Sequence, residues 1–245
     1  MITLAVMESS AIGPHAAREQ FAALIAQGGA VPLDEAAFLI SAVILRRESI
    51  DVVEQMSRLD ELAAAVPTPT IQGIAQFLFS GAEAFVGNRA EYYDPDNSLL
   101  TRVLDRHAGI PISLSVIMME VSRRLGVDVV GIGMPGHFLT GLASRDGSIP
   151  ELFVDPFHEG RITDENGCRA LFHSLAGPQQ TFQRIFLFPA PPMAIVERML
   201  NNLKAIYISH SNWGAVRSVM SLRACFPGLG KSEHDEFLRL MAPLN

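Results

Sequence analysis

Hydrophobic positions in the first third of the chain recur three or four residues apart, the spacing of one face of a helix. Pro14 can open a first helix, and Gly28 lies where that helix would end. A second helix is expected to start near Asp34, whose carboxylate can accept hydrogen bonds from free amides. A third spans roughly residues 51–66 and stops at Pro67. The pattern predicts an amino-terminal helical region without candidate chemistry.

The pattern of apolar residues changes in the middle of the chain. The run PISLSVIMMEVSRRLG has the helical spacing and predicts a buried helix from Pro111 to Gly126. The three runs that follow, VDVVGIG, HFLTGLAS and ELFVDPF, are short and rich in β-formers, and turn residues separate them. They predict consecutive antiparallel strands, and with the helices an α+β protein.

Helical spacing returns in the carboxyl part. Several positions match the apolar and proline positions of a tetratricopeptide repeat: Leu200, Leu203, Tyr207, Ala215, Val219, Leu222 and Pro227. A lone helical hairpin cannot bury its apolar face by itself. We therefore expect the hairpin to dock on the rest of the protein, joined to it by the proline-rich segment FPAPP.

Composition excludes several classes of protein. With 49% hydrophobic and 18% charged residues, the chain is rich enough in apolar side chains to exclude wholesale disorder. Its 19 basic and 26 acidic residues give a formal net charge of −7, which argues against sequence-independent binding of nucleic acid. Four arginines next to carboxylates are expected to form solvated helix faces: Arg102, Arg106, Arg123 and Arg124.

The amino terminus and the cysteines favour a cytoplasmic location. The opening MITLAVMESS lacks the basic n-region of a signal peptide. Prolines and glutamines interrupt the uncharged stretch 62–82, so no membrane span is expected. Cys168 and Cys225 are far apart in the sequence, and no disulfide is expected between them.

Candidate chemistry lies in the predicted sheet. His137 and Asp155 come at the ends of two β-rich runs, where antiparallel neighbours can place them side by side. A carboxylate that holds an imidazole tautomer, beside a nucleophile at a helix start, is a catalytic arrangement. His158 lies three residues after Asp155, so a shared metal site is an alternative use of the same side chains.

Three segments between about Tyr92 and Pro227 carry a family resemblance: DPDNSLLTRVLDRHAGIPISLSVIMMEVSRRLGVDVVGIGMPGHFLTG, FVDPFHEGR and ERMLNNLKAIYI. They resemble the SirB-type branch of the transglutaminase-like superfamily, with its tetratricopeptide-like tail. The resemblance implies a papain- or transglutaminase-like core of helix and antiparallel strands at residues 92–188. An amino-terminal helical subdomain (1–91) and a helical tail (189–245) would flank this core.

The resemblance places His137 and Asp155 on the superfamily's histidine and aspartate positions. The cysteine does not carry over, because Pro111 lies near its position and Ser113 is the nearest hydroxyl. Cys168 lies beyond Asp155 and is not expected to be the nucleophile.

The missing cysteine favours a vestigial, noncatalytic module that binds a protein or peptide in the old active-site cleft, without cofactor or metal. The alternative is a hydrolase of amide or ester bonds, with Ser113 as nucleophile, His137 as base and Asp155 as the orienting acid. Neither interpretation determines the oligomeric state.

Overall fold

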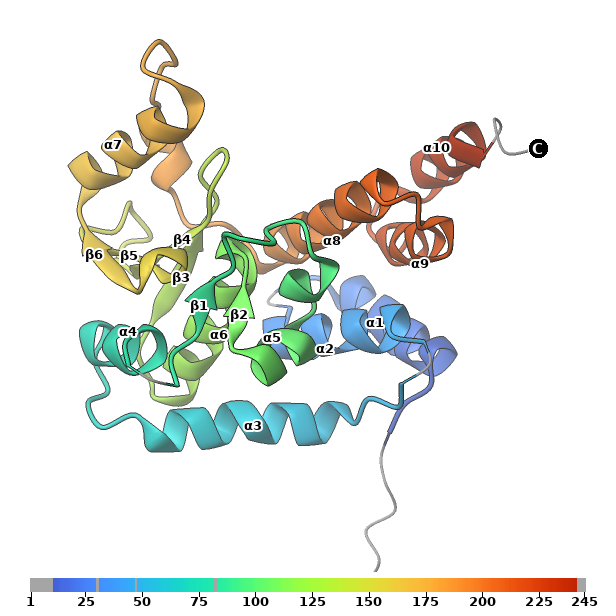
Figure 1. The fold of residues 1–245 in the computed structure, drawn as a ribbon, viewed down its shortest axis with the longest axis horizontal. Coiled ribbons are helices and arrows are strands. Elements are labelled where there is room, and N and C mark those ends of the chain that lie inside the picture. Colours follow the sequence, from blue (N-terminus) through green and yellow to red (C-terminus); the bar gives the residue numbers. More distant parts are fainter. Residues whose placement is uncertain (1–10, 30, 47, 82, 242–245) are drawn as a thin grey trace, which may run out of the picture.

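The computed structural model describes residues 11–29, 31–46, 48–81 and 83–241 (Figure 1). The amino-terminal part is helical, as the sequence predicts. Its helices are α1 (Pro14–Gln27), α2 (Leu33–Ile44), α3 (Val52–Ala65) and α4 (Ile71–Phe79). Asp51 caps α3 by accepting from the amides of Val53 and Glu54. The hydrophobic pattern did not predict α4, which Thr70 caps by accepting from the Gly73 amide.

The buried central helix is confirmed as α6 (Pro111–Arg124), with Pro111 in its first turn. Short elements lead into it: the parallel pair β1 (Val86–Gly87) and β2 (Ala108–Gly109), the 3₁₀ helix η1 (Pro95–Ser98) and α5 (Leu100–Arg106). Gly126, with φ of 70°, lies just beyond the helix in the left-handed region that glycine favours.

A four-stranded sheet follows in the order β3-β4-β5-β6, with every pair antiparallel. The strands are β3 (Val129–Ile132), β4 (Leu139–Leu142), β5 (Phe153–Asp155) and β6 (Arg161–Thr163). The first three were predicted, whereas β6 is too short to show a periodicity. The 3₁₀ turn η2 (Pro156–His158) joins β5 to β6. Helix α6 packs against β3 and β4, and α7 (Glu165–Ala176) packs against β6.

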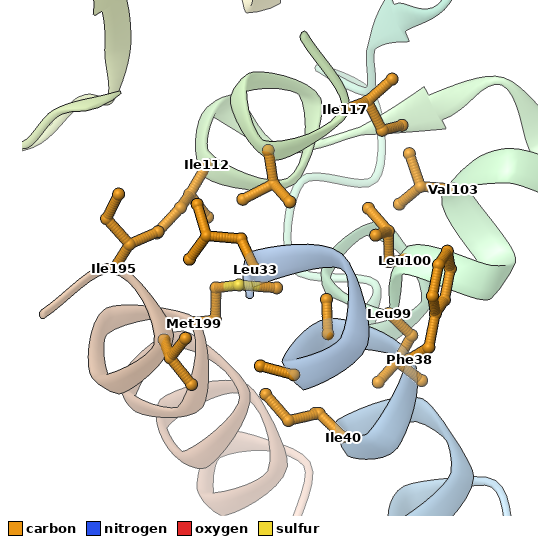
Figure 2. Close-up of a cluster of buried hydrophobic side chains, with 14 of the residues drawn as sticks. Leu33, Phe38, Ile40, Leu99, Leu100, Val103, Ile112, Ile117, Ile195 and Met199 are labelled. Carbon is orange, nitrogen blue, oxygen red and sulfur yellow. The ribbon is translucent and has the colours of Figure 1, made fainter. Parts of the chain in front are cut away.

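The carboxyl part consists of the 3₁₀ turn η3 (Arg184–Leu187) and the helices α8 (Pro192–Ser209), α9 (Trp213–Arg223) and α10 (Gly230–Met241). Figure 2 shows the α8 side chains Ile195 and Met199 beside Leu33 of α2 and Ile112 of α6. The docking of the tail on the rest of the protein is therefore confirmed. One buried apolar cluster contains residues from all three predicted segments, 1–91, 92–188 and 189–245.

The solvated-face prediction is wrong for Arg124. Its side chain is only 11% exposed and donates to the buried carboxylate of Asp34 at 2.8 Å, because α2 and α6 pack together in the core. The α+β prediction is confirmed. No helix within the described residues is both long and apolar enough to cross a membrane.

Candidate functional site

The predicted hydrogen bond between His137 and Asp155 is present. Nε2 of His137 lies 2.9 Å from Oδ1 of Asp155, and the two side chains are only 4% and 5% exposed. Asp155 is the last residue of β5, while His137 lies two residues before β4 rather than on it. Thr140 pairs with Val154 in the β4–β5 ladder, and this register brings the two functional residues together.

Asp155 is held by bonds to both of its oxygens. Oδ1 also accepts from the amides of Phe157 and His158, and Oδ2 lies 2.7 Å from Nδ1 of His158. Burial by itself would raise the pKa of Asp155, but the hydrogen bonds and charges of His137 and His158 outweigh it and lower that pKa. An ionised carboxylate therefore faces both imidazoles at neutral pH.

The tautomer of His137 follows from this contact. When the ring is neutral and donates its Nε2–H to the Asp155 carboxylate, its lone pair is on Nδ1, which accepts no hydrogen bond from the described residues. This nitrogen is the one available to accept a proton from, or bond to, a molecule beside it.

Ser113 lies at the start of α6 with its hydroxyl engaged by the backbone. Oγ donates to the carbonyl of Asn97 at 2.6 Å and accepts from the amide of Ile110 at 3.1 Å. The side chain is fully buried, and a Cβ added at Gly109 would lie only 2.7 Å from its oxygen. Its hydroxyl is placed to fix the entry into α6.

The two cysteines are free and lie outside this arrangement. Cys168 is buried in α7, where burial and then the nearby Asp164 raise the pKa of its thiol to about 12. Burial also raises the pKa of Cys225, in the tail. Both thiols stay protonated at neutral pH, which is the poorly nucleophilic form.

A cleft of about 310 Å³ opens beside His137. It is lined by Tyr92, Pro111, Ile112, Gly136, His137, Phe138, Arg198 and Asn202. Among these residues none carries a thiol or an aliphatic hydroxyl. Pro111, which lies near the position expected for the nucleophile, lines the cleft but has no group that could attack a substrate.

Arg198 and Asn202 are site residues that the sequence reasoning missed. Both come from α8, and Arg198 donates to the carbonyls of Met134 and His137 at 3.1 and 2.7 Å. Its guanidinium also lies 5.3 Å from the centre of the Phe138 ring. The segment ERMLNN mixes polar and apolar residues, so no pattern in the sequence singles out Arg198 or Asn202.

The electrostatics of the cleft favour an electron-rich occupant. Burial lowers the pKa of Arg198, although a guanidinium remains charged at neutral pH. Burial raises the pKa of Tyr92, so its phenol stays protonated and can donate. Asn202 adds amide donors and an acceptor, while Pro111 and Ile112 form an apolar wall. Peptide carbonyls or a carboxylate match these groups.

Separately, His137, Asp155 and His158 are a candidate metal-ligand set.

This fold, with a histidine–aspartate pair beside a helix start, is that of the transglutaminase-like class. The chain belongs to the transglutaminase-like superfamily, whose family model matches residues 46–201. The matched range crosses both predicted subdomain boundaries.

Three relatives illustrate the similarity. The chain is 42% identical over 132 residues to a UPF0162 protein of Xylella fastidiosa, covering 53% of this chain and 46% of the relative. It is 32% identical over 162 residues to a UPF0162 protein of Pseudomonas aeruginosa, covering 66% and 56%. It is 24% identical over 128 residues to Protein SirB1 of Salmonella typhimurium, covering 52% and 46%. These relatives support the SirB-type assignment.

The chain spans about half the length of the curated relatives that it matches. No solved structure matches the chain significantly.

Proposed function

We propose that the protein is a noncatalytic transglutaminase-like module that binds a segment of a partner protein in the cleft beside His137. The observation that carries this proposal is the start of α6, where Pro111 lines the cleft and the Ser113 hydroxyl is engaged by backbone groups. A superfamily member without a thiol or a free hydroxyl at this point lacks the group that attacks a carbonyl.

The remaining cleft residues suit recognition. Arg198, Asn202 and Tyr92 offer donors, and His137 offers an acceptor at Nδ1. Backbone carbonyls of an extended peptide would pair with the donors, and an apolar side chain would pack on Ile112 and Phe138. Two free cysteines fit a reducing compartment, so we place this binding in the cytoplasm.

The test is quantitative affinity capture from cell extract by the intact protein and by cleft variants. Asn202→Arg adds bulk and charge to the cleft, and His137→Ala removes the imidazole. Asn166→Arg is the matched control, because Asn166 is exposed on α7 and does not line the cleft. We expect a partner that the intact protein and the control retain and both cleft variants lose. Equal retention by all four proteins would contradict the proposal.

A hydrolase remains the second candidate, because the buried His137–Asp155 pair has the geometry of a base and its orienting acid. Its nucleophile would be Ser113, whose hydroxyl would first have to leave the Asn97 carbonyl. Assays with ester and amide substrates distinguish the hydrolase from the noncatalytic binding module. Turnover that Ser113→Ala and His137→Ala both abolish, in folded protein, would favour the hydrolase.

A further inference from the structure

Two imidazoles share one buried carboxylate at the end of β5. Nε2 of His137 lies 2.9 Å from Oδ1 of Asp155, and Nδ1 of His158 lies 2.7 Å from Oδ2. The three candidate ligand atoms all lie within 4.8 Å of one another. One histidine is enough to orient a base or to line a binding cleft, so the second imidazole is not accounted for by either function above.

We propose that His137, Asp155 and His158 bind a divalent first-row transition metal ion of the Zn²⁺ type. Two imidazole nitrogens and one carboxylate oxygen are a donor set that such ions prefer. Magnesium and calcium are disfavoured, because they are bound mainly through oxygen. This site does not depend on the proposed binding of a partner.

The three donors lie close enough to reach a common ion. Ligands about 2.1 Å from a tetrahedral ion lie about 3.4 Å apart. The imidazole nitrogens now lie at hydrogen-bond distance from two different oxygens of Asp155, 2.9 Å from Oδ1 and 2.7 Å from Oδ2. A small rotation of both rings away from the carboxylate would therefore make room for the ion. The two imidazole nitrogens themselves lie at most 4.8 Å apart. His158 is on the single turn η2 with its side chain 33% exposed, so its ring has room to turn toward the ion.

Proton balance requires only a tautomer change. A neutral imidazole that donates to Asp155 moves its proton to the other ring nitrogen and presents a lone pair at the ligand atom. The carboxylate binds in its ionised form. The amides of Phe157 and His158 hold Oδ1 in place, which is the outer support that metal ligands usually have. Three protein ligands leave coordination positions for water.

The test is titration of the untagged full chain, dialysed against chelator, with Co²⁺ followed by absorption and with Zn²⁺ followed by calorimetry. We compare the intact protein with His158→Gln, Asp155→Asn and the control His210→Gln. His210 is exposed at the end of α8, far along the chain from the site. Thermal melting in chelator verifies that each variant is folded.

We expect the intact protein and the control to bind a single equivalent with a ligand-field spectrum and a raised thermal midpoint. Removing a hydrogen-bond partner of a metal ligand typically weakens metal binding about tenfold to a hundredfold. Removing a ligand itself should weaken it by at least as much. No stoichiometric binding by the intact protein, or unchanged binding by folded His158→Gln, would overturn the proposal.

Discussion

The Ser113 hydroxyl links the start of α6 to the Asn97 carbonyl and the Ile110 amide. Its replacement by alanine leaves the buried Asn97 carbonyl and Ile110 amide with poorer partners. The Ile110 amide still donates to the Asn97 carbonyl at 3.3 Å, so neither group is left without a partner. We therefore expect Ser113→Ala to lower the free energy of unfolding by about 0.5–1.5 kcal/mol, the net contribution of a typical hydrogen bond. Urea unfolding measures this change. Ser57→Ala, at an exposed hydroxyl on α3, is the control and should change little. Unchanged stability of Ser113→Ala would mean that the hydroxyl is not structural.

A second residue-scale feature is the carboxylate pair between α2 and α6. Arg123 and Arg124 each contact both Glu120 and Asp34. Burial and then the charge of Asp34 raise the pKa of Glu120. The pKa of Asp34 is lowered, because hydrogen bonds from Arg124 and the Glu35 amide outweigh its burial.

This arrangement predicts a pH-dependent effect of Glu120→Gln. Above the ordinary glutamate pKa, Glu120 loses its proton in the unfolded chain but keeps it in the folded protein. The free energy of unfolding of the wild-type protein therefore falls as pH rises from the ordinary pKa to the raised one. The variant lacks this loss. Its stability relative to wild type should therefore increase as pH rises from the ordinary glutamate pKa through the raised one. Urea unfolding across that range checks this, with Glu61→Gln as the exposed control. A constant difference would contradict it.

At the scale of elements, long periodic runs were predictable, whereas the shortest strand and the contacts that depend on helix docking were not. The helical spacing of α1, α3 and α6 and the period of β3 to β5 are local properties of the chain. Three residues of β6 carry no period, and its place is set by pairing with β5. The His137–Asp155 contact was predictable because antiparallel neighbours align. Arg198 was not, because its role depends on where α8 docks.

Helix α8 positions the segment before β4 through Arg198. Its bonds to the Met134 and His137 carbonyls join elements that are otherwise distant in the sequence. We expect Arg198→Met to cost about 1.5–3 kcal/mol in unfolding free energy, typical of hydrogen bonds from a charged group. Amide hydrogen exchange of residues 133–138 should also accelerate, because this segment loses its anchor.

The control is Arg217→Met, at an exposed arginine on α9. If exchange in residues 133–138 were the same in both variants, Arg198 would not be the anchor.

At the scale of the whole molecule, the helices of the tail contribute side chains to the main apolar core. Side chains of α8 and α9 such as Leu203 and Val219 are fully buried in the cluster that also contains α2 and α6 residues. The apolar residues of α2 and α6 thus have partners that lie more than sixty positions away along the sequence. The three segments implied by the family resemblance, 1–91, 92–188 and 189–245, therefore all contribute to one buried apolar cluster.

Deletion of the tail tests this dependence. A chain that ends at Arg184 loses the burial of Ile195, Met199 and Leu203 and exposes the α2 and α6 surfaces beneath them. Each large apolar side chain contributes about 1.5–3 kcal/mol when buried, so the loss should be several kcal/mol and the shortened chain should aggregate. A chain that ends at Pro227 is the control, because it lacks α10 but keeps α8 and α9. We expect soluble yield and thermal midpoint to fall far more for the Arg184 chain than for the control. An unchanged midpoint of the Arg184 chain would instead make the tail an independent arm, and the cleft wall formed by α8 would not be part of a fixed site.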